Sequence, residues 1–327
     1  MTLPRRRFLH WAAGALALPA VSRLAWAQTY PTRPVRVIVP FAPGGQTDTI
    51  ARLVSQKLSD VFDKQFYVEN VGGAGGNIGM GRAAQATPDG YTLIVVDGTS
   101  FVVNPTLYPK VPYDPYKDFD PITAAATTTQ VLTVTPTLPA RSVAELIELV
   151  KANPGKYSYS SPGVGTSGHL IGELFKITFG LDLVHVPFPG AGPAVAATIA
   201  GHTPISFGSP VSVVGQVNEG KLRALAVATK KRLTALPDVP TMTEVGHPEI
   251  ESNQWIGLLA PAGTPKDIIA AVSRETRKVI ALTETKDRLA QLGFDPLGNT
   301  PEEMAKQIKV EMEIWAKVIR DANIKPQ

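Results

Sequence analysis

The stretch VRVIVPFAPGGQTD, residues 35–48, decides the fold. Residues 35–41 are mostly apolar and β-branched, which predicts a buried strand. Pro43, Gly44 and Gly45 then predict a turn. Apolar residues recur at helical spacing over 50–61, so we expect a helix there with Thr47 or Asp48 as its N-cap. The stretch is therefore a strand–turn–helix unit, the building block of an α/β sheet.

The same alternation runs through the chain. Further strands are expected at 65–71, 92–97, 131–135, 157–161, 183–187, 205–208 and 222–228, with helices between most of them. The string Thr-Pro-Glu-Glu at 300–303 predicts a capping box at the start of the last helix. The predicted fold class is α/β, with mainly parallel sheets flanked by helices. Proline clusters near 127 and 250 predict crossings between two lobes, one of 28–127 plus 251–327 and the other of 128–250.

Composition narrows the class of protein. The chain has 327 residues, of which 44% are hydrophobic and 18% charged, and this mix is typical of a globular protein. It contains no cysteine, which excludes thiolate zinc sites, iron–sulfur clusters, thiol nucleophiles and disulfides.

The first 27 residues are typical of an export signal. Their four cations are all arginines, an apolar run follows over 11–18, and Ala25-Trp26-Ala27 resembles a cleavage site. The string RRRFL at 5–9 resembles a twin-arginine signal. We expect cleavage after Ala27 and a periplasmic location. Without these arginines the charge is balanced, since 32 − 4 = 28 cations face 28 acids.

No catalytic or cofactor motif stands out. The sequence holds no Walker loop, no H-E-x-x-H and no G-x-S-x-G elbow, and the histidines after residue 27 lack metal-ligand spacing. The G-x-G-x-x-G at 163–168 lacks an acid at the end of the next strand, which a dinucleotide site needs. We therefore expect no enzyme activity, no cofactor, no metal and no nucleic-acid partner.

Four loops share a composition that favours anion binding. Residues 44–48, 98–100, 163–167 and 190–192 follow predicted strands, precede predicted helices, and are rich in Gly, Ser and Thr. They contain no Lys or Arg, and Asp48 is their one acid. Ligands of open α/β sheets lie beyond the carboxyl ends of the strands, where helix N-termini present free N–H groups. These loops predict a site for a small carboxylate, although their glycines could also serve only to make tight turns.

Several strings resemble the tripartite tricarboxylate transporter substrate-binding proteins, the TctC or Bug family. The resemblance covers essentially all of 30–327, in order. Its strings are YP at 30–31, PGG at 43–45, VEN at 68–70, GAGGNIG at 73–79, PDGYTL at 88–93, HL at 169–170, LPDVPT at 236–241 and APAGTP at 260–265.

The resemblance implies a two-lobed clamshell that closes on a small carboxylate and delivers it to membrane permease subunits. It implies a monomer without cofactors. The ligand contacts carried over from the family are Phe41, Gln46, Thr47, Asp48, Ser161, Gly165, Thr166, Ser167 and His169. To these we add Thr99, Ser100, Phe188 and Gly190, which come from the other loops and from the aromatic residues. His169 could instead only brace its loop.

One departure from the family bears on the ligand. Residues 186–190 read Val-Pro-Phe-Pro-Gly where the family often has Val-Pro-Tyr-Lys-Gly. If the missing lysine faced the cleft, then Phe41, Phe101 and Phe188 would favour an apolar or aromatic monocarboxylate. Two other functions stay open at this point: a ligand-sensing receptor for a membrane signalling partner, and a secreted enzyme.

Overall fold

The computed structural model describes residues 30–321 and 324. Residues 30–32 fall in a separate unit, and the fold below is that of the unit that begins at Arg33. The predicted signal peptide over 1–27 and its cleavage site lie outside the described residues. Among the described helices, none combines the length and the apolar composition that a membrane crossing requires.

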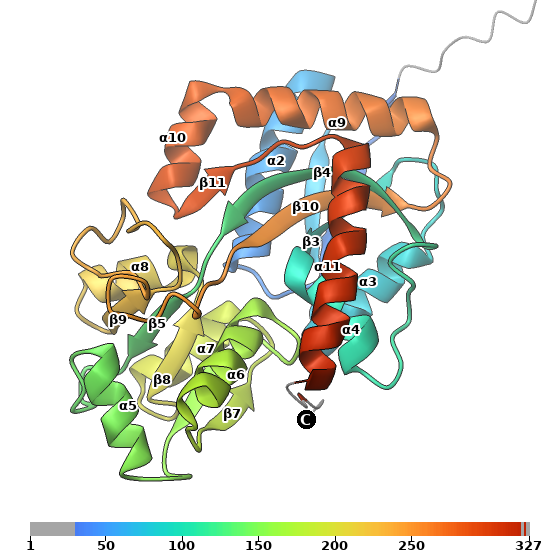
Figure 1. Cartoon of the computed structure of the whole chain (residues 1–327). Coiled ribbons are helices and arrows are strands. Elements are labelled where there is room, and N and C mark those ends of the chain that lie inside the picture. Colours follow the sequence, from blue (N-terminus) through green and yellow to red (C-terminus); the bar gives the residue numbers. More distant parts are fainter. Residues whose placement is uncertain (1–29, 322–323, 325–327) are drawn as a thin grey trace, which may run out of the picture. The chain divides into compact units, whose positions relative to one another are not determined.

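In the described chain, six strands form the first sheet, in the order β11-β4-β10-β3-β1-β2 (Figure 1). β1, β2 and β3 are parallel, whereas β10 runs antiparallel to both β3 and β4. Every residue of β3 and β10 is buried, as expected for strands covered on both faces. The strands are β1 (Val35–Val39), β2 (Phe66–Asn70), β3 (Thr92–Asp97), β4 (Phe119–Thr128), β10 (Gln254–Pro261) and β11 (Phe294–Pro296).

The helices around this sheet pack against it and against one another. α2 contacts β2, β3 and α9, and α11 packs on α4 and β4. Beneath α4, the ring of Phe101 packs against Trp255, Tyr113 and Phe119 with centroids 5.4–6.5 Å apart. The helices are α2 (Gln46–Phe62), α3 (Asn77–Ala84), α4 (Gly98–Leu107), α9 (Lys266–Ala281), α10 (Thr283–Gln291) and α11 (Pro301–Asp321), with a 3₁₀ turn, η1 (Ala74–Gly76), before α3.

The second sheet has the order β7-β6-β8-β5-β9 within the described residues. β6 is parallel to β7 and β8, and β5 is antiparallel to β8 and β9. Its core is built around the fully buried side chains of Tyr159, Phe175 and Phe207. Its elements are β5 (Val131–Val134), α5 (Val143–Lys151), β6 (Ser158–Ser161), α6 (Ser167–Phe179), β7 (Val184–Pro187), α7 (Ala191–Ile199), β8 (Ile205–Gly208), α8 (Pro210–Asn218) and β9 (Arg223–Val227).

Two segments connect the sheets. Thr129 and Gln130 lead from β4 directly into β5, and residues 228–253 lead from β9 back to β10. Because β4 leaves the first sheet and β10 returns to it, the two strands run in opposite directions side by side, and the sheet becomes mixed. The two-lobed α/β class is confirmed, with mixed rather than mainly parallel sheets. The lobe boundaries near 127 and 250 stay a prediction.

The helix starts test the capping predictions. The predicted N-cap of α2 is wrong, because Gly45 holds that position and Thr47 and Asp48 lie in the first turn. The Asp48 carboxylate accepts a hydrogen bond from Gly44 N at 3.0 Å, which stabilises an earlier start. The capping box at α11 is confirmed: Glu303 N donates to Thr300 Oγ1 at 3.2 Å, and Thr300 N donates to Glu303 Oε2 at 2.8 Å.

A glycine in α6 allows a test of how closely this helix packs on the core of the second sheet. A Cβ added at Gly172 would lie 2.3 Å from the ring of Tyr159, whereas one added at Gly215 in α8 would meet nothing within 4 Å. Gly172→Ala is therefore expected to cost about 1–3 kcal/mol of unfolding free energy through overpacking.

Gly215→Ala is the matched control and is expected to leave stability unchanged or to raise it by about 1 kcal/mol through helix propensity. Thermal unfolding of both variants measures the difference. Equal melting temperatures would contradict the close packing of α6 on Tyr159.

Candidate functional site

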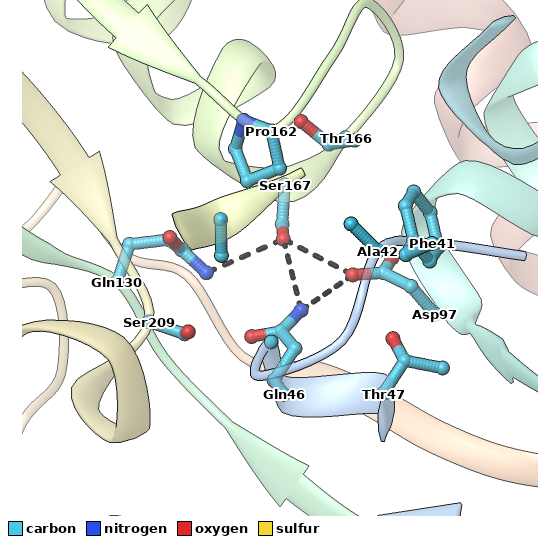
Figure 2. Close-up of a pocket in the computed structure, with 12 residues that line it drawn as sticks. Phe41, Ala42, Gln46, Thr47, Asp97, Gln130, Pro162, Thr166, Ser167 and Ser209 are labelled. Carbon is cyan, nitrogen blue, oxygen red and sulfur yellow. Dashed lines mark hydrogen bonds between the residues drawn. The ribbon is translucent and has the colours of Figure 1, made fainter. Parts of the chain in front are cut away.

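One cavity lies where the loops of the two sheets meet (Figure 2). The strands β1, β3, β6 and β8 all direct their carboxyl ends toward it, so the loops that follow them supply most of its wall. The lining residues are Phe41, Ala42, Gly45, Gln46, Thr47, Asp97, Gln130, Pro162, Thr166, Ser167, Ala191 and Ser209.

In the described chain, the N-termini of five helices reach this cavity. α2 begins at Gln46, α6 at Ser167 and α7 at Ala191, while Asp97 and Ser209 are the N-caps of α4 and α8. Each N-terminus carries a partial positive charge and N–H groups without a helical partner. Because no Lys or Arg is among the lining residues, this charge comes from the backbone alone. Such an arrangement favours a small anion.

Ser167 is the centre of a hydrogen-bonded cluster that joins the two lobes. Gln130 Nε2 and Gln46 Nε2 donate to Ser167 Oγ at 3.3 and 3.4 Å, and Ser167 Oγ donates to Asp97 Oδ2 at 3.3 Å (Figure 2). Gln46 Nε2 also donates to Asp97 Oδ2 at 2.5 Å. The side chain of Ser167 on α6 thereby binds the first turn of α2 and the end of β3.

The cluster continues into the connection between the lobes. Gln254 Nε2 donates to Gln46 Oε1 at 3.0 Å, and Ser252 Oγ donates to Gln254 Oε1 at 2.8 Å. Ser252 lies at the end of the second connecting segment, Gln254 is the first residue of β10, and Gln130 is the last residue of the first segment. Hydrogen bonds therefore link the cavity wall to both segments that would bend if the lobes moved.

Asp97 is the one acid among the lining residues. Its side chain is buried, and its Oδ1 accepts a hydrogen bond from Ser100 N at 3.0 Å, as an N-cap of α4 does. Burial raises the pKa of Asp97, and the hydrogen bonds from Ser100, Gln46 and Ser167 only partly offset that effect. The carboxyl group is thus poised to hold a proton more readily than an exposed aspartate.

The loops of the two lobes touch beside the cavity. A Cβ added at Gly190 would lie 2.6 Å from the Cβ of Ala42, and one at Gly45 would lie 3.5 Å from that of Ala191. The cavity has a volume of about 30 Å³, room for a few water molecules at most. A ligand larger than a few water molecules would require these loops to separate.

Five of the residues predicted from sequence line the cavity together. Phe41, Gln46 and Thr47 come from the loop after β1 and the start of α2, and Thr166 and Ser167 come from the start of α6. Three of the four loops singled out by composition thus reach this cavity, whereas 98–100 contributes no lining residue.

The other predicted residues lie outside the lining and mostly brace the loops. Asp48 receives hydrogen bonds from Gly44 N, Arg52 and Asn70, which hold the 41–45 loop. Ser161 Oγ contacts His185 Nε2 at 2.7 Å and accepts a hydrogen bond from Gly163 N at 3.2 Å. These side chains shape the wall of the cavity from behind.

His169 also acts behind the wall. Its Nδ1 accepts a hydrogen bond from Gly165 N at 3.2 Å, and its ring lies 4.3 Å from that of His185. Gly165 has a φ of +82°, and a Cβ there would lie 2.0 Å from Asn104 Oδ1, so this turn requires glycine. The geometry favours the alternative in which His169 braces its loop.

The remaining predicted residues are placed elsewhere. Thr99 lines a neighbouring groove between α6 and α11 that shares Ser167 with the cavity, and Ser100 contributes its backbone N–H to Asp97. Gly190 lies next to Ala42, and Phe188 is half-buried outside the lining. Phe101 is fully buried in the aromatic core, so of the three phenylalanines named above only Phe41 reaches the cavity.

Sequence reasoning missed three polar residues of the lining. Asp97 ends a strand before Gly-Thr-Ser, which is a helix N-cap pattern, and Ser209 precedes a proline at the first helical position. These two signals were available. Gln130 has no local signal, because only the crossing from β4 to β5 brings it to Ser167.

Metal binding finds no support in the described part of the chain. No three His, Asp or Glu side chains there are grouped closely enough to hold an ion.

Residues 50–324 match the model of the tripartite tricarboxylate transporter family receptor. The chain belongs to this family. Solved structures agree with the match. A protein described as a periplasmic transporter is 46% identical to the chain and superimposes with a TM-score of 0.87, covering 90% of this chain and 99% of its own.

Two solved proteins with bound ligands also resemble the chain. Rpa4515 of R. palustris, solved with adipate, is 33% identical with a TM-score of 0.88, over 91% of this chain and 100% of its own. MatC (Rpa3494) from Rhodopseudomonas palustris, solved with bound malate, is 32% identical with a TM-score of 0.84, over 89% and 100%. Together with the family match, these neighbours indicate a periplasmic carboxylate-binding receptor.

The brace formed by His169 predicts acid sensitivity. Burial lowers the pKa of His169 from 6.5 to about 4, and the nearby Lys176 adds to the shift. The unfolded chain therefore binds a proton between pH 6.5 and 4 that the folded chain excludes, so the stabilising effect is complete above pH 6.5 and is lost as the pH falls toward 4. The loss between pH 7.5 and 4.5 should amount to about 2–3 kcal/mol.

Urea unfolding of wild type and His169→Gln at the two pH values measures this loss. Glutamine can still accept the hydrogen bond from Gly165 N but does not titrate, so its loss should be smaller by that amount. His202→Gln, at an exposed position, serves as the control and should behave like wild type. The same loss in all three proteins would exclude His169 as the cause.

Proposed function

We propose that this chain is a periplasmic receptor that captures a small carboxylate between its lobes and delivers it to the membrane subunits of a tripartite transporter. It binds its ligand without converting it. The observation that carries the proposal is the convergence of five helix N-termini, within the described chain, on one cavity lined by hydroxyl and amide side chains.

The relatives support the chemical class of the ligand. Adipate and malate, the ligands of Rpa4515 and MatC, are small aliphatic dicarboxylates. The chain shares their fold over about nine-tenths of its length. A ligand of this class suits a cavity whose charge complementarity comes from backbone dipoles and polar side chains rather than from a fixed cation.

Binding requires the lobes to move as hinged bodies. We take the lobes to be 28–127 plus 251–327 and 128–250, so that the hinge lies in the two connecting segments. Ligand entry would separate the contacts between Ala42 and Gly190, and closure around the ligand would restore them. The receptor is a monomer in this proposal, and the closed form is the one that the permease recognises.

The expectation of an aromatic ligand has little geometric support, because Phe101 and Phe188 lie outside the cavity lining. Phe41 alone offers an aromatic surface there. We therefore place aliphatic mono- and dicarboxylates ahead of aromatic ones.

A thermal-shift panel of succinate, adipate, malate, citrate and benzoate tests the ligand class. Saturation at about 100 times the dissociation constant adds about 2.7 kcal/mol to the unfolding free energy, which should raise the melting temperature by about 5 °C or more. Stabilisation by citrate alone, or by none of the five, would contradict the proposal.

The same prediction extends to the cavity residues. Thr47→Ala combined with Ser167→Ala removes two hydroxyls from the lining and should weaken the best ligand of the panel by about tenfold or more in calorimetry. Thr243→Ala combined with Thr283→Ala removes two exposed hydroxyls and should leave the affinity unchanged. Equal affinity in both double variants would exclude this cavity as the binding site.

Export adds a separate prediction. The twin-arginine-like segment should be removed after Ala27, so the mature protein recovered from the periplasm should begin at Gln28. Replacement of Arg5 and Arg6 by lysine should block export by the twin-arginine route. N-terminal sequencing and cell fractionation check both points, and a mature protein that starts elsewhere or stays periplasmic in the variant would contradict them.

A further inference from the structure

The cavity of this anion receptor contains an anionic residue of its own. Asp97 is 2% exposed, and its carboxylate lies in the wall between Gln46 and Ser167. No lining residue is a Lys or Arg, so a bound carboxylate would meet this acid without a neutralising cation. Two like charges confined in one small site favour sharing of a proton.

Asp97 already engages two of the hydrogen-bond donors of the cavity. Gln46 Nε2 and Ser167 Oγ, two polar groups of the lining, both donate to Asp97 Oδ2. A ligand that takes these donors leaves Asp97 Oδ2 without them in a buried position. Loss of two donors and arrival of a second negative charge both make ionised Asp97 less stable.

Charged side chains on the neighbouring elements do not compensate. On α2, Arg52 pairs with Asp48 at 2.9 Å. On β1 and α3, Arg36 and Arg82 pair with Glu69 at 3.4 and 2.8 Å. The cations around β3 are thus committed to other acids.

The titratable groups on α11 and α6 also favour protonation of Asp97. Glu311 on α11 is held by Trp255 Nε1 at 2.7 Å, and burial raises its pKa, with Asp97 among the further causes. His169 on α6 is neutral near pH 7, since burial lowers its pKa to about 4. Burial likewise raises the pKa of Asp97 itself. Glu311 therefore places a second acid, whose pKa is coupled to Asp97, on a helix next to the site.

We propose that Asp97 makes carboxylate capture proton-linked, so that the cavity binds a ligand carboxylate together with one proton held between Asp97 and the ligand. This inference rests on the proposed function and adds the charge state that the site selects. The proton comes from solvent: ionised Asp97 of the free receptor takes it up as the ligand displaces Gln46 and Ser167. The affinity of the site for its ligand then falls as the pH rises into the alkaline range.

Calorimetry tests the proposal with the panel member among adipate, malate and succinate that stabilises the protein most. Titrations at pH 8 in buffers of different ionisation enthalpy should show uptake of about one proton for each ligand bound. The affinity of the wild-type protein should fall by up to about tenfold for each pH unit in the alkaline part of the range from 6 to 9.

Asp97→Asn provides the decisive comparison. Asparagine resembles the protonated acid in shape and can donate a hydrogen bond but does not titrate, so the affinity of the variant should not fall between pH 6 and pH 9. Asp295→Asn is the matched control, since Asp295 is exposed on β11, and it should keep the wild-type slope.

The outcomes separate failure of this inference from failure of the proposed function. A wild-type affinity that is flat from pH 6 to 9, or equal slopes in wild type and Asp97→Asn, overturns the inference while leaving the proposed function intact. Absence of binding by all three probes overturns the proposed function, and this inference falls with it. If Asp97→Asn fails to fold, the proton count of the wild-type protein alone decides.

Discussion

The hydrogen bonds that converge on Ser167 are the interaction on which the functional arrangement depends. They connect α6 of one lobe to Gln46 and Asp97 of the other and to Gln130 in the crossing between them. Because these groups are buried, each lost partner would leave an unsatisfied polar atom, which is costly in a low-dielectric interior. In the proposed function, the cluster would couple closure of the lobes to the chemistry of the cavity.

The cavity offers positive charge to an anion without a Lys or Arg in its lining. Helix N-termini supply partial positive charge that is oriented by the fold and is held in place by the sheets behind the loops. A lysine in the same place would bind an anion strongly but would select for its charge more than for its shape. When the wall consists of dipoles and neutral donors, the choice of ligand depends on the placement of Gln46, Thr47, Thr166 and Ser167. A single acid such as Asp97 then has a large influence on the charge of the site.

Much of the architecture was predictable because its signals are local. The β-branched run at 35–39, the glycine turn and the helical spacing after it predict β1 and α2 directly, although the cap of α2 shifted to Gly45. The loops after β1 and β6 were predicted as ligand contacts, and five of their residues line the cavity. The braces behind the wall, Asp48, Ser161 and His169, carry the same residue types and were not separable from true lining residues by sequence.

The sequence by itself determined the alternation of strands and helices, the family, and the polar, cation-free character of the loops, because periodicity and turn chemistry act over a few residues. Only the tertiary structure decided that Gln46, Asp97, Gln130 and Ser167 share one cavity. The hydrogen-bonded pairs among them are 37–121 residues apart in the sequence. Their meeting depends on the strand order and on the direct crossing from β4 to β5, which place distant loops at one edge, and no local pattern encodes that.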